Sequence, residues 1–350
     1  MTVLLVFSNV LLFAFSICLL VFIVFRRHFN KRNQQRFRGR YKQIETDVLA
    51  AFTSDDKEKI LETAERYKIY PDELTQVILD YVKVIAGTER TKLELLFDAS
   101  VKQDILKDLY SRNMIKRLKA ARIFVIFSGP DDIKHLLKLL NDKPLVRLTA
   151  INALSQIYSV EAISRIFQTF EEDKTPNLKS YFDTMFGMGD RIESYLKVYM
   201  KKDLSIDKLC LLIDLAGYIP LYAAYPEVQD LAEHESKEIR IHVARSLGNL
   251  TVPDTEETLI ALSKEEIWEV KSQAIVSLGK LKTQKGMDIL TEALYSPIWY
   301  IRLNAGQAMA KMGDMGIDRL FQIAEQKKDK FAAEMASMVL DEMIIPKEVS

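Results

Sequence analysis

The sequence predicts an all-α fold, in which one N-terminal transmembrane helix is followed by a right-handed α-solenoid of stacked helical hairpins. Three observations lead to this prediction. A helical pattern recurs with a 31-residue step towards the C-terminus, the first 25 residues carry no charge, and a cluster of basic residues follows them directly. Each observation is taken in turn below, starting at the N-terminus.

Residues 3–25 form an apolar run that only three polar residues interrupt. A helix of this length spans a hydrocarbon core of about 30 Å. Buried core helices are seldom this long and apolar on all sides. A cleaved signal peptide would carry a basic residue before a shorter apolar run and a small-residue cleavage site after it. Here no charge precedes the run and an Arg-Arg pair at 26–27 ends it, so we expect a membrane anchor.

Residues 26–43 are predicted to form a basic juxtamembrane segment. By the positive-inside rule, these cations place the N-terminus outside the cell membrane and the C-terminal domain in the cytosol, as a single-pass protein. They could also contact anionic lipid, at about 1 kcal/mol for each well-placed cation, or they could set topology alone. The candidate membrane-surface residues are Arg26, Arg27, Lys31, Arg32, Arg36, Arg38, Arg40 and Lys42.

The rest of the chain is acidic. Of the 49 basic residues eight lie in 26–42, which leaves 41 against 49 acidic residues in 43–350, a net charge of −8. Such a body repels phosphate backbones, so no nucleic-acid partner is expected. The two cysteines, Cys18 and Cys210, both lie in apolar surroundings and are interpreted as reduced, buried thiols rather than as a disulfide.

The repeat is clearest in three segments that align at a 31-residue step: 238–250, 269–281 and 300–312. Apolar residues recur in them every three or four positions, as in an amphipathic helix. A second apolar helical pattern and a short break follow each one, so a unit is a helical hairpin. Weaker copies extend the array back to residue 112, and Ala150, Ala274 and Ala305 are expected where adjacent units pack closely. We therefore predict a solenoid over 112–345 and divergent helical repeats or an N-terminal cap over 44–111.

These units resemble the HEAT family in its short bacterial form. The resemblance rests on the pairs Val146-Arg147, Ile239-Arg240, Val270-Lys271 and Ile301-Arg302, and on Leu247-Gly248 and Leu278-Gly279 further along two of the helices. It implies a ladder in which each cation lies next to an acid of its own or the neighbouring unit, about five residues before the cation. The ladder residues are Arg147, Arg240, Lys271 and Arg302 with Asp142, Glu235 and Glu266; Pro297 occupies the fourth acid position and is expected to break the ladder.

The sequence contains no recognisable catalytic or metal-binding motif. It has no phosphate-binding glycine loop, no nucleophile elbow and no zinc signature. The histidines do not form a ligand set with one another or with cysteine, and surface or interface positions are expected for them. We therefore predict no catalytic residue, no cofactor and no metal, and we do not expect an enzyme. The four histidines are His28, His135, His234 and His242.

Two aromatic groups are candidate partner-binding residues. The only two tryptophans lie 31 residues apart, at one register position in consecutive repeats. They could pack between repeats or form an exposed stripe that anchors a partner. Three tyrosines in an irregular, proline-containing stretch could form a recognition loop or face the core. The candidates are Trp268, Trp299 and Tyr300, and Tyr218, Tyr222 and Tyr225.

An array of this kind presents an extended surface, and its function depends on the residues exposed there. We predict a membrane-tethered, cytosolic scaffold or adaptor for a protein partner, for which a membrane-associated enzyme such as a glycosyltransferase is one candidate. A HEAT-like enzyme is an alternative, because the family resemblance extends to chromophore lyases and to DNA glycosylases. A sensor of the lipid surface that works through residues 26–42 is a third possibility.

Overall fold

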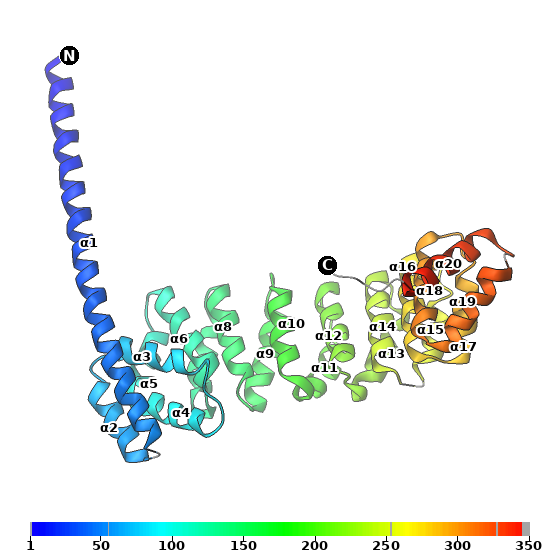
Figure 1. The fold of residues 1–350 in the computed structure, drawn as a ribbon, viewed down its shortest axis with the longest axis horizontal. Helices are drawn as coiled ribbons and strands as arrows, with labels where there is room; N and C mark the ends of the chain where they lie inside the picture. Colours follow the sequence, from blue (N-terminus) through cyan, green and yellow to red (C-terminus); the bar gives the residue numbers. More distant parts are fainter. Residues whose placement is uncertain (1, 55, 253, 327, 345–350) are drawn as a thin grey trace. The chain divides into compact units, whose positions relative to one another are not determined.

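The computed structural model describes residues 2–54, 56–252, 254–326 and 328–344, and their side chains between residues 15 and 343. Every regular element in these ranges is an α-helix or a short 3-10 helix (Figure 1). The predicted all-helical class is therefore confirmed. The chain divides into two compact units, residues 1–127 and 128–350, and each is described by itself.

The first unit is built around one end of a long helix. Helix α1 runs for 52 residues, and its last turns bury Ile44, Val48 and Phe52 against the neighbouring helices. Arg40 joins α1 to α3, because its Nη1 lies 3.1 Å from Glu73 Oε1 and its guanidinium lies over the Tyr70 ring. The helices are α1 (Thr2–Thr53), α2 (Lys57–Tyr67), α3 (Pro71–Tyr81), α4 (Thr88–Ser100), α5 (Lys102–Leu109) and α6 (Met114–Phe127).

The N-terminal part of α1 carries the predicted membrane span. Residues 3–14 of that span lie outside the described side chains. From Phe15 to Phe25 the large apolar side chains are exposed. In the part of the chain that the structure describes, no helix combines the length and the apolarity that a bilayer span requires.

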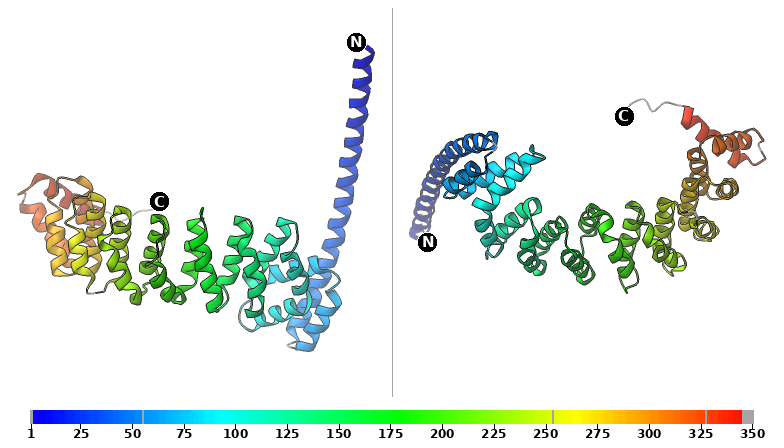
Figure 2. Two further views of the ribbon diagram at one scale, coloured as in Figure 1. Left: turned by 180° about the vertical axis from the view of Figure 1, so that it is seen from behind. Right: turned by 90° about the horizontal axis from the view of Figure 1, so that it is seen from below.

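The second unit is a row of helical hairpins (Figure 2). The first helices of the hairpins are α8 (Pro144–Ser155), α10 (Leu178–Gly187), α12 (Ile206–Tyr218), α14 (Lys237–Leu250), α16 (Trp268–Leu281) and α18 (Trp299–Lys311). The second helices are α9 (Val160–Glu172), α11 (Glu193–Tyr199), α13 (Tyr225–Asp230), α15 (Thr255–Leu262), α17 (Gln284–Ala293) and α19 (Asp314–Gln326). A short helix α7 (Ile133–Leu137) precedes the row and α20 (Lys330–Ile344) ends it, with 3-10 turns at η1 (Pro130–Asp132), η2 (Lys138–Asn141), η3 (Gly189–Ile192), η4 (Tyr222–Ala224) and η5 (Leu231–Glu233).

Successive first helices approach one another very closely. A methyl group on Gly248 would overlap the Ser277 side chain and lie 2.9 Å from its Cα, and one on Gly217 would lie 2.7 Å from Cα of Ser246. Gly279 has the same relation to Ala308 one repeat further on, at 2.7 Å from its Cβ. Ala150, Ala274 and Ala305, which we expected where adjacent units pack closely, are fully buried. Small residues on both sides of each joint thus set the spacing of α12, α14, α16 and α18.

Replacing Gly248 with alanine should therefore destabilise the array. The added methyl group has no space between α14 and α16, and overpacking of this kind costs about 1–3 kcal/mol. The better helix propensity of alanine, worth up to about 1 kcal/mol, offsets part of this loss. Urea denaturation followed by circular dichroism measures the change in the free energy of unfolding.

Gly187→Ala is the matched control, because Gly187 ends α10 and has nothing within 4 Å of the added methyl group. It should be neutral or slightly stabilising. Equal stabilities for the two variants would contradict the close approach at Gly248.

Candidate functional site

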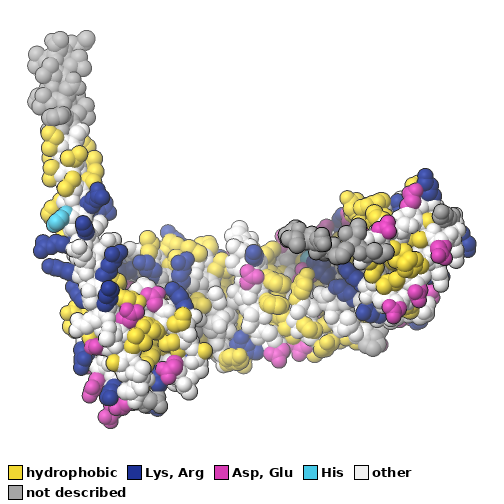
Figure 3. Space-filling view, viewed as in Figure 1, with side chains coloured by type: hydrophobic (Ala, Val, Ile, Leu, Met, Phe, Trp, Pro, Cys, Tyr) yellow, Lys and Arg dark blue, Asp and Glu magenta, His cyan; other side chains and the backbone are white. Residues whose placement is uncertain are grey.

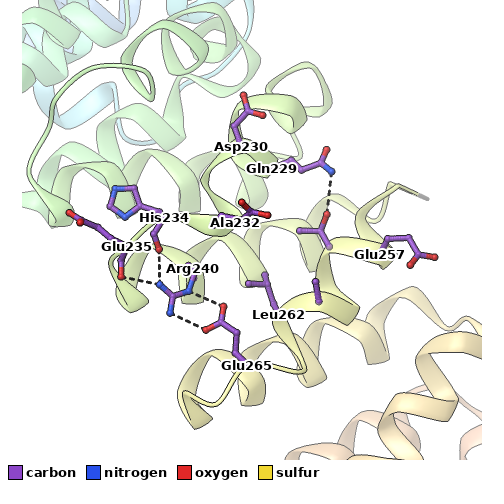
Figure 4. Close-up of a pocket in the computed structure, with 12 residues that line it drawn as sticks. Gln229, Asp230, Ala232, His234, Glu235, Arg240, Glu257, Leu262 and Glu265 are labelled. Carbon is purple, nitrogen blue, oxygen red and sulfur yellow. Dashed lines mark hydrogen bonds and ion pairs between the residues drawn. The ribbon is translucent and has the colours of Figure 1, made fainter.

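Arg240, near the start of α14, forms hydrogen bonds with the turn before that helix. Arg240 donates from Nε and Nη2 to the two carboxylate oxygens of Glu265, at 2.8 and 2.9 Å (Figure 4). Its Nη1 donates to the backbone carbonyls of His234 and Glu235, at 2.6 and 3.0 Å. One guanidinium therefore joins the end of η5 to the turn that follows α15.

The same carbonyl contacts recur in α18 of the second unit and in α6 of the first. Arg302 donates from Nη1 to the carbonyls of Ser296 and Pro297, at 2.8 and 3.1 Å. Arg117 donates in the same way to the carbonyls of Ser111 and Arg112, at 2.8 and 3.2 Å. In each case the acceptors lie six and five residues before the arginine. We expected the acid ladder to break at α18, where Pro297 has no carboxylate. The backbone contacts continue there, because Pro297 still supplies a carbonyl.

The acids that pair with the ladder cations differ from those expected. Arg147 Nη2 lies 2.8 Å from Asp173, which is 26 residues further along the chain, and Glu265 is 25 residues beyond Arg240. The cation and its acid thus belong to neighbouring units, but Asp142, Glu235 and Glu266 are not these acids. For Arg240 the reason is geometric, because its Nη1 reaches the backbone carbonyl of Glu235 and not the carboxylate. The Asp142 carboxylate instead accepts from the backbone N–H of Lys143, at 2.7 Å.

A cleft of about 740 Å³ lies beside the Arg240–Glu265 pair, between η5 and α15 (Figure 4). Five of the twelve residues that line it are acidic, and the guanidinium of Arg240, also in the lining, is already paired with Glu265. His234, also in the lining, accepts at Nδ1 from the backbone N–H of Ser236, so this histidine stabilises the turn before α14. The acidic residues of the lining are Asp230, Glu233, Glu235, Glu257 and Glu265.

The two tryptophans lie on the surface in a continuous aromatic cluster. Trp268 and Trp299 begin α16 and α18, and they are 41% and 47% exposed, while Tyr300 is 58% exposed. The Tyr300 ring stacks on Trp268 at 5.8 Å and meets Trp299 edge to face at 5.1 Å. Tyr295 and Ile298, in the turn before α18, are also exposed and add to the apolar surface. Of the two arrangements that the sequence left open, the structure therefore shows the exposed one. We call Trp268, Trp299 and Tyr300 the aromatic cluster.

The three candidate tyrosines do not form one group. Tyr218 ends α12, is exposed, and meets Phe182 of α10 edge to face at 6.0 Å. Tyr222 lies in η4 and is exposed, whereas Tyr225 begins α13 and is half-buried. Burial raises the pKa of Tyr225 above its usual value. The irregular stretch thus directs two side chains outwards and one inwards.

The remaining candidate residues lie on several different elements. Within the described ranges, no group of three or more His, Cys, Asp or Glu side chains could hold a metal ion. His242 Nδ1 lies 2.9 Å from Asp214 Oδ1, and His28 is exposed on α1. Lys271 is half-buried on α16, and Glu266 is exposed in the turn before that helix.

The two cysteines differ in environment. Cys210 is buried in α12 as expected, and its burial raises the thiol pKa to about 12. Cys18 is exposed on α1, so the expectation of a buried thiol is wrong there.

Stacked hairpins joined by close helix contacts and arginine-held turns define a protein of the α-solenoid class. Residues 225–310 match the family model for HEAT repeats, which supports the resemblance seen in the sequence. A search of curated proteins gave no match.

Several solved structures are similar to this chain in fold. A mutant of Kap121p is 13% identical, covers 87% of this chain and 41% of its own, and has a TM-score of 0.53. The complex of CpcE and CpcF of phycocyanin lyase from Nostoc is 14% identical, with 69% and 94% of the two chains covered and a TM-score of 0.33. Human deoxyhypusine hydroxylase is 14% identical with the same coverage and a TM-score of 0.30. At 13% identity, the likeness to the Kap121p mutant shows the fold alone.

Removing the guanidinium of Arg240 should destabilise the protein more than removing a surface cation. In Arg240→Met, Glu265 loses its partner and two carbonyls lose their donor, which should lower the free energy of unfolding by about 2–3 kcal/mol. Arg240→Lys should recover only part of the loss, because an ammonium cannot make the bidentate contact. Chemical denaturation measures both variants.

Lys285→Met is the matched control. Lys285 forms an ion pair with Glu257 at 2.6 Å, but both side chains are well exposed, so stability should hardly change. A loss in Arg240→Met no larger than in this control would mean that the Arg240 contacts do not stabilise the array.

The Cys210 thiol should resist alkylation in the folded protein. With a pKa raised to about 12, the group stays protonated at pH 8, and the thiolate that reacts with iodoacetamide is scarce. In a Cys18→Ser background, mass spectrometry should find Cys210 modified in urea but not in buffer. Rapid modification in buffer would show that α12 opens there or that the thiol is accessible.

Proposed function

We propose that this chain is a membrane-tethered scaffold or adaptor that binds a protein partner through the aromatic cluster. The observation that carries the proposal is the exposure of three aromatic rings that contact one another at the starts of consecutive first helices. Tryptophan and tyrosine dominate the energetics of protein interfaces, and they do so in clusters. The HEAT-repeat fold is compatible with this role.

The geometry of the cluster suits an anchor for a folded partner. Its rings are held by one another and by their position at helix starts, so little side-chain freedom is lost on binding. At the same register position in α14, Lys237 pairs with Glu269 at 2.7 Å, which gives the apolar surface a charged rim. An apolar centre with a polar rim is the usual composition of a specific interface.

The proposed tether is the N-terminal part of α1, with residues 3–25 in the cell membrane and the second unit in the cytosol. At about 100° per residue, the eight cations of 26–42 surround the helix rather than follow one face. Cations on all sides suit a helix that emerges upright from the headgroup layer better than one that lies flat on it. In this proposal the cations other than Arg40, which pairs with Glu73, contact anionic lipid, the partner is a membrane-associated protein, and the chain has no catalytic activity of its own.

The partner should be captured at the cluster by photo-crosslinking in intact membranes. The full-length chain carries a photo-crosslinking amino acid in place of Trp268, and a control chain carries it in place of the exposed Phe321 on α19. Only the first should give a discrete crosslinked species. Trp299→Ala/Tyr300→Ala should reduce its yield about tenfold or more, since hot-spot residues each contribute about 2 kcal/mol.

Tyr158→Ala/Phe321→Ala removes two other exposed aromatic side chains and should leave the yield unchanged. Identical crosslinked species from positions 268 and 321, or an undiminished yield in the 299/300 variant, would remove the cluster from the proposal.

The tether has a separate test. Deletion of residues 3–25 should release the chain from carbonate-washed membranes, and a deleted chain that still sediments with them would overturn this part.

A further inference from the structure

A second surface feature lies at the opposite ends of the first helices. Asn249, Lys280 and Lys311 occupy one register position, 31 residues apart, near the C-termini of α14, α16 and α18. Arg245 lies one turn before Asn249 on α14. We call these four residues the cationic strip. Lys and Arg side chains gather over the region of α14 and α16 in Figure 3.

The close helix approach brings the strip together. Asn249 and Lys280 directly follow Gly248 and Gly279, the residues at which the neighbouring helices almost touch. Lys280 Nζ donates to Asn249 Oδ1 at 2.6 Å, so at least this contact crosses from one repeat to the next. Lys311 and Arg245 are also close enough to Lys280 to act on its charge, so side chains of neighbouring repeats form one patch.

The positive charges of the strip are poorly neutralised within the chain. Lys280 is exposed, but partial desolvation by neighbouring groups and the nearby charges of Lys311 and Arg245 lower its pKa below the usual value. Arg245 shares Asp214 with His242, at 3.4 and 2.9 Å. Among the described residues, neither Lys280 nor Lys311 forms an ion pair.

Helix electrostatics favour the two lysines of the strip but do not offset the repulsion between their charges. Lysines in the last turn of α16 and α18 are favourable, because they face the negative end of each helix dipole. That interaction acts along one helix and does not remove the repulsion between neighbouring repeats. A ligand with negative charge would remove it, and the amide group of Asn249 offers a further donor.

We propose that the cationic strip binds an acidic segment of a protein, through the carboxylates of its Asp and Glu side chains. Charge complementarity supports this occupant, because clustered ammonium and guanidinium groups favour carboxylates and steer them during association. The net charge of −8 over residues 43–350 disfavours long polyanions, which would extend beyond the strip onto acidic surface. A short acidic segment meets only the local positive charge.

The strip is independent of the aromatic cluster. The cluster lies at the N-terminal ends of α16 and α18, and the strip lies at the C-terminal ends of the same helices and of α14. A helix of 13 residues separates the two ends by about 20 Å. One partner could contact both surfaces, but either could bind without the other.

The test uses the full-length chain in non-ionic detergent and a fluorescein-labelled peptide of alternating Glu and Gly, with a Lys-Gly peptide of equal length as control. Fluorescence anisotropy should show binding of the acidic peptide alone at about 50 mM salt, and loss of binding by about 200 mM. Lys280→Ala/Lys311→Ala should raise the Kd about tenfold or more. An amine-reactive reagent should label Lys280, and bound peptide should protect it.

Two matched variants support this test. Lys134→Ala/Lys285→Ala removes two exposed lysines on α7 and α17 and should bind the acidic peptide as wild type does. Trp299→Ala/Tyr300→Ala should also bind normally, so failure of the aromatic cluster would not affect the result. Binding is compared only between variants whose thermal stability equals that of the wild type.

Three outcomes would overturn the inference. The first is equal affinity in the wild type and in Lys280→Ala/Lys311→Ala. The second is displacement of the peptide by millimolar inorganic phosphate, which would assign the strip to phosphate groups. The third is stronger protection of Lys280 by vesicles containing anionic lipid than by the peptide, which would assign it to a membrane surface.

Discussion

The spacing of the first helices is the constraint on which the rest of the second unit depends. Gly217, Gly248 and Gly279 lie against small residues of the next helix, where any side chain would collide. Dispersion contacts between helices are made over short distances only, so this approach maximises burial along the joint. It also places equivalent residues of consecutive repeats side by side. The aromatic cluster and the cationic strip both result from this placement.

A second set of contacts holds the turns between hairpins. The arginine near the start of a first helix donates to two backbone carbonyls of the preceding turn, as Arg240 and Arg302 do. Those carbonyls lie near the end of the preceding helical segment, where no helical N–H is available to them. A guanidinium has enough donors to bind a carboxylate of the next unit as well. Arg240 does both, so it links three segments of the chain.

The two ends of the first helices differ in chemical character. Acidic residues lie in the first turns of α12, α14 and α16, at Asp207, Glu238 and Glu269, and lysines lie in the last turns of α16 and α18. This distribution matches the helix dipoles and is stabilising in each repeat. Repeated in register, it also gives the surface an acidic and aromatic edge and a basic edge. A partner could distinguish the two edges of the array by this difference in charge.

The sequence by itself determined the repeat, its register and its helical hairpins. A hydrophobic period and a 31-residue step depend only on which residues recur, and they correctly placed the starts of α14, α16 and α18. The relation between Trp268 and Trp299 followed from the same register. The resemblance to HEAT repeats also came from residues in the chain, and the match over 225–310 supports it.

Only the tertiary structure decided which groups touch. The exposure of Trp268 depends on how much of it the neighbouring helix covers, and no sequence period contains that information. The carbonyl contacts of Arg302 have no sequence signature, because every residue, Pro297 included, carries a carbonyl. The choice of Glu265 rather than Glu235 as an acid partner depends on a distance between two turns. The register of the repeats follows from the order of residues in the chain, whereas the contacts between side chains depend on how the helices pack.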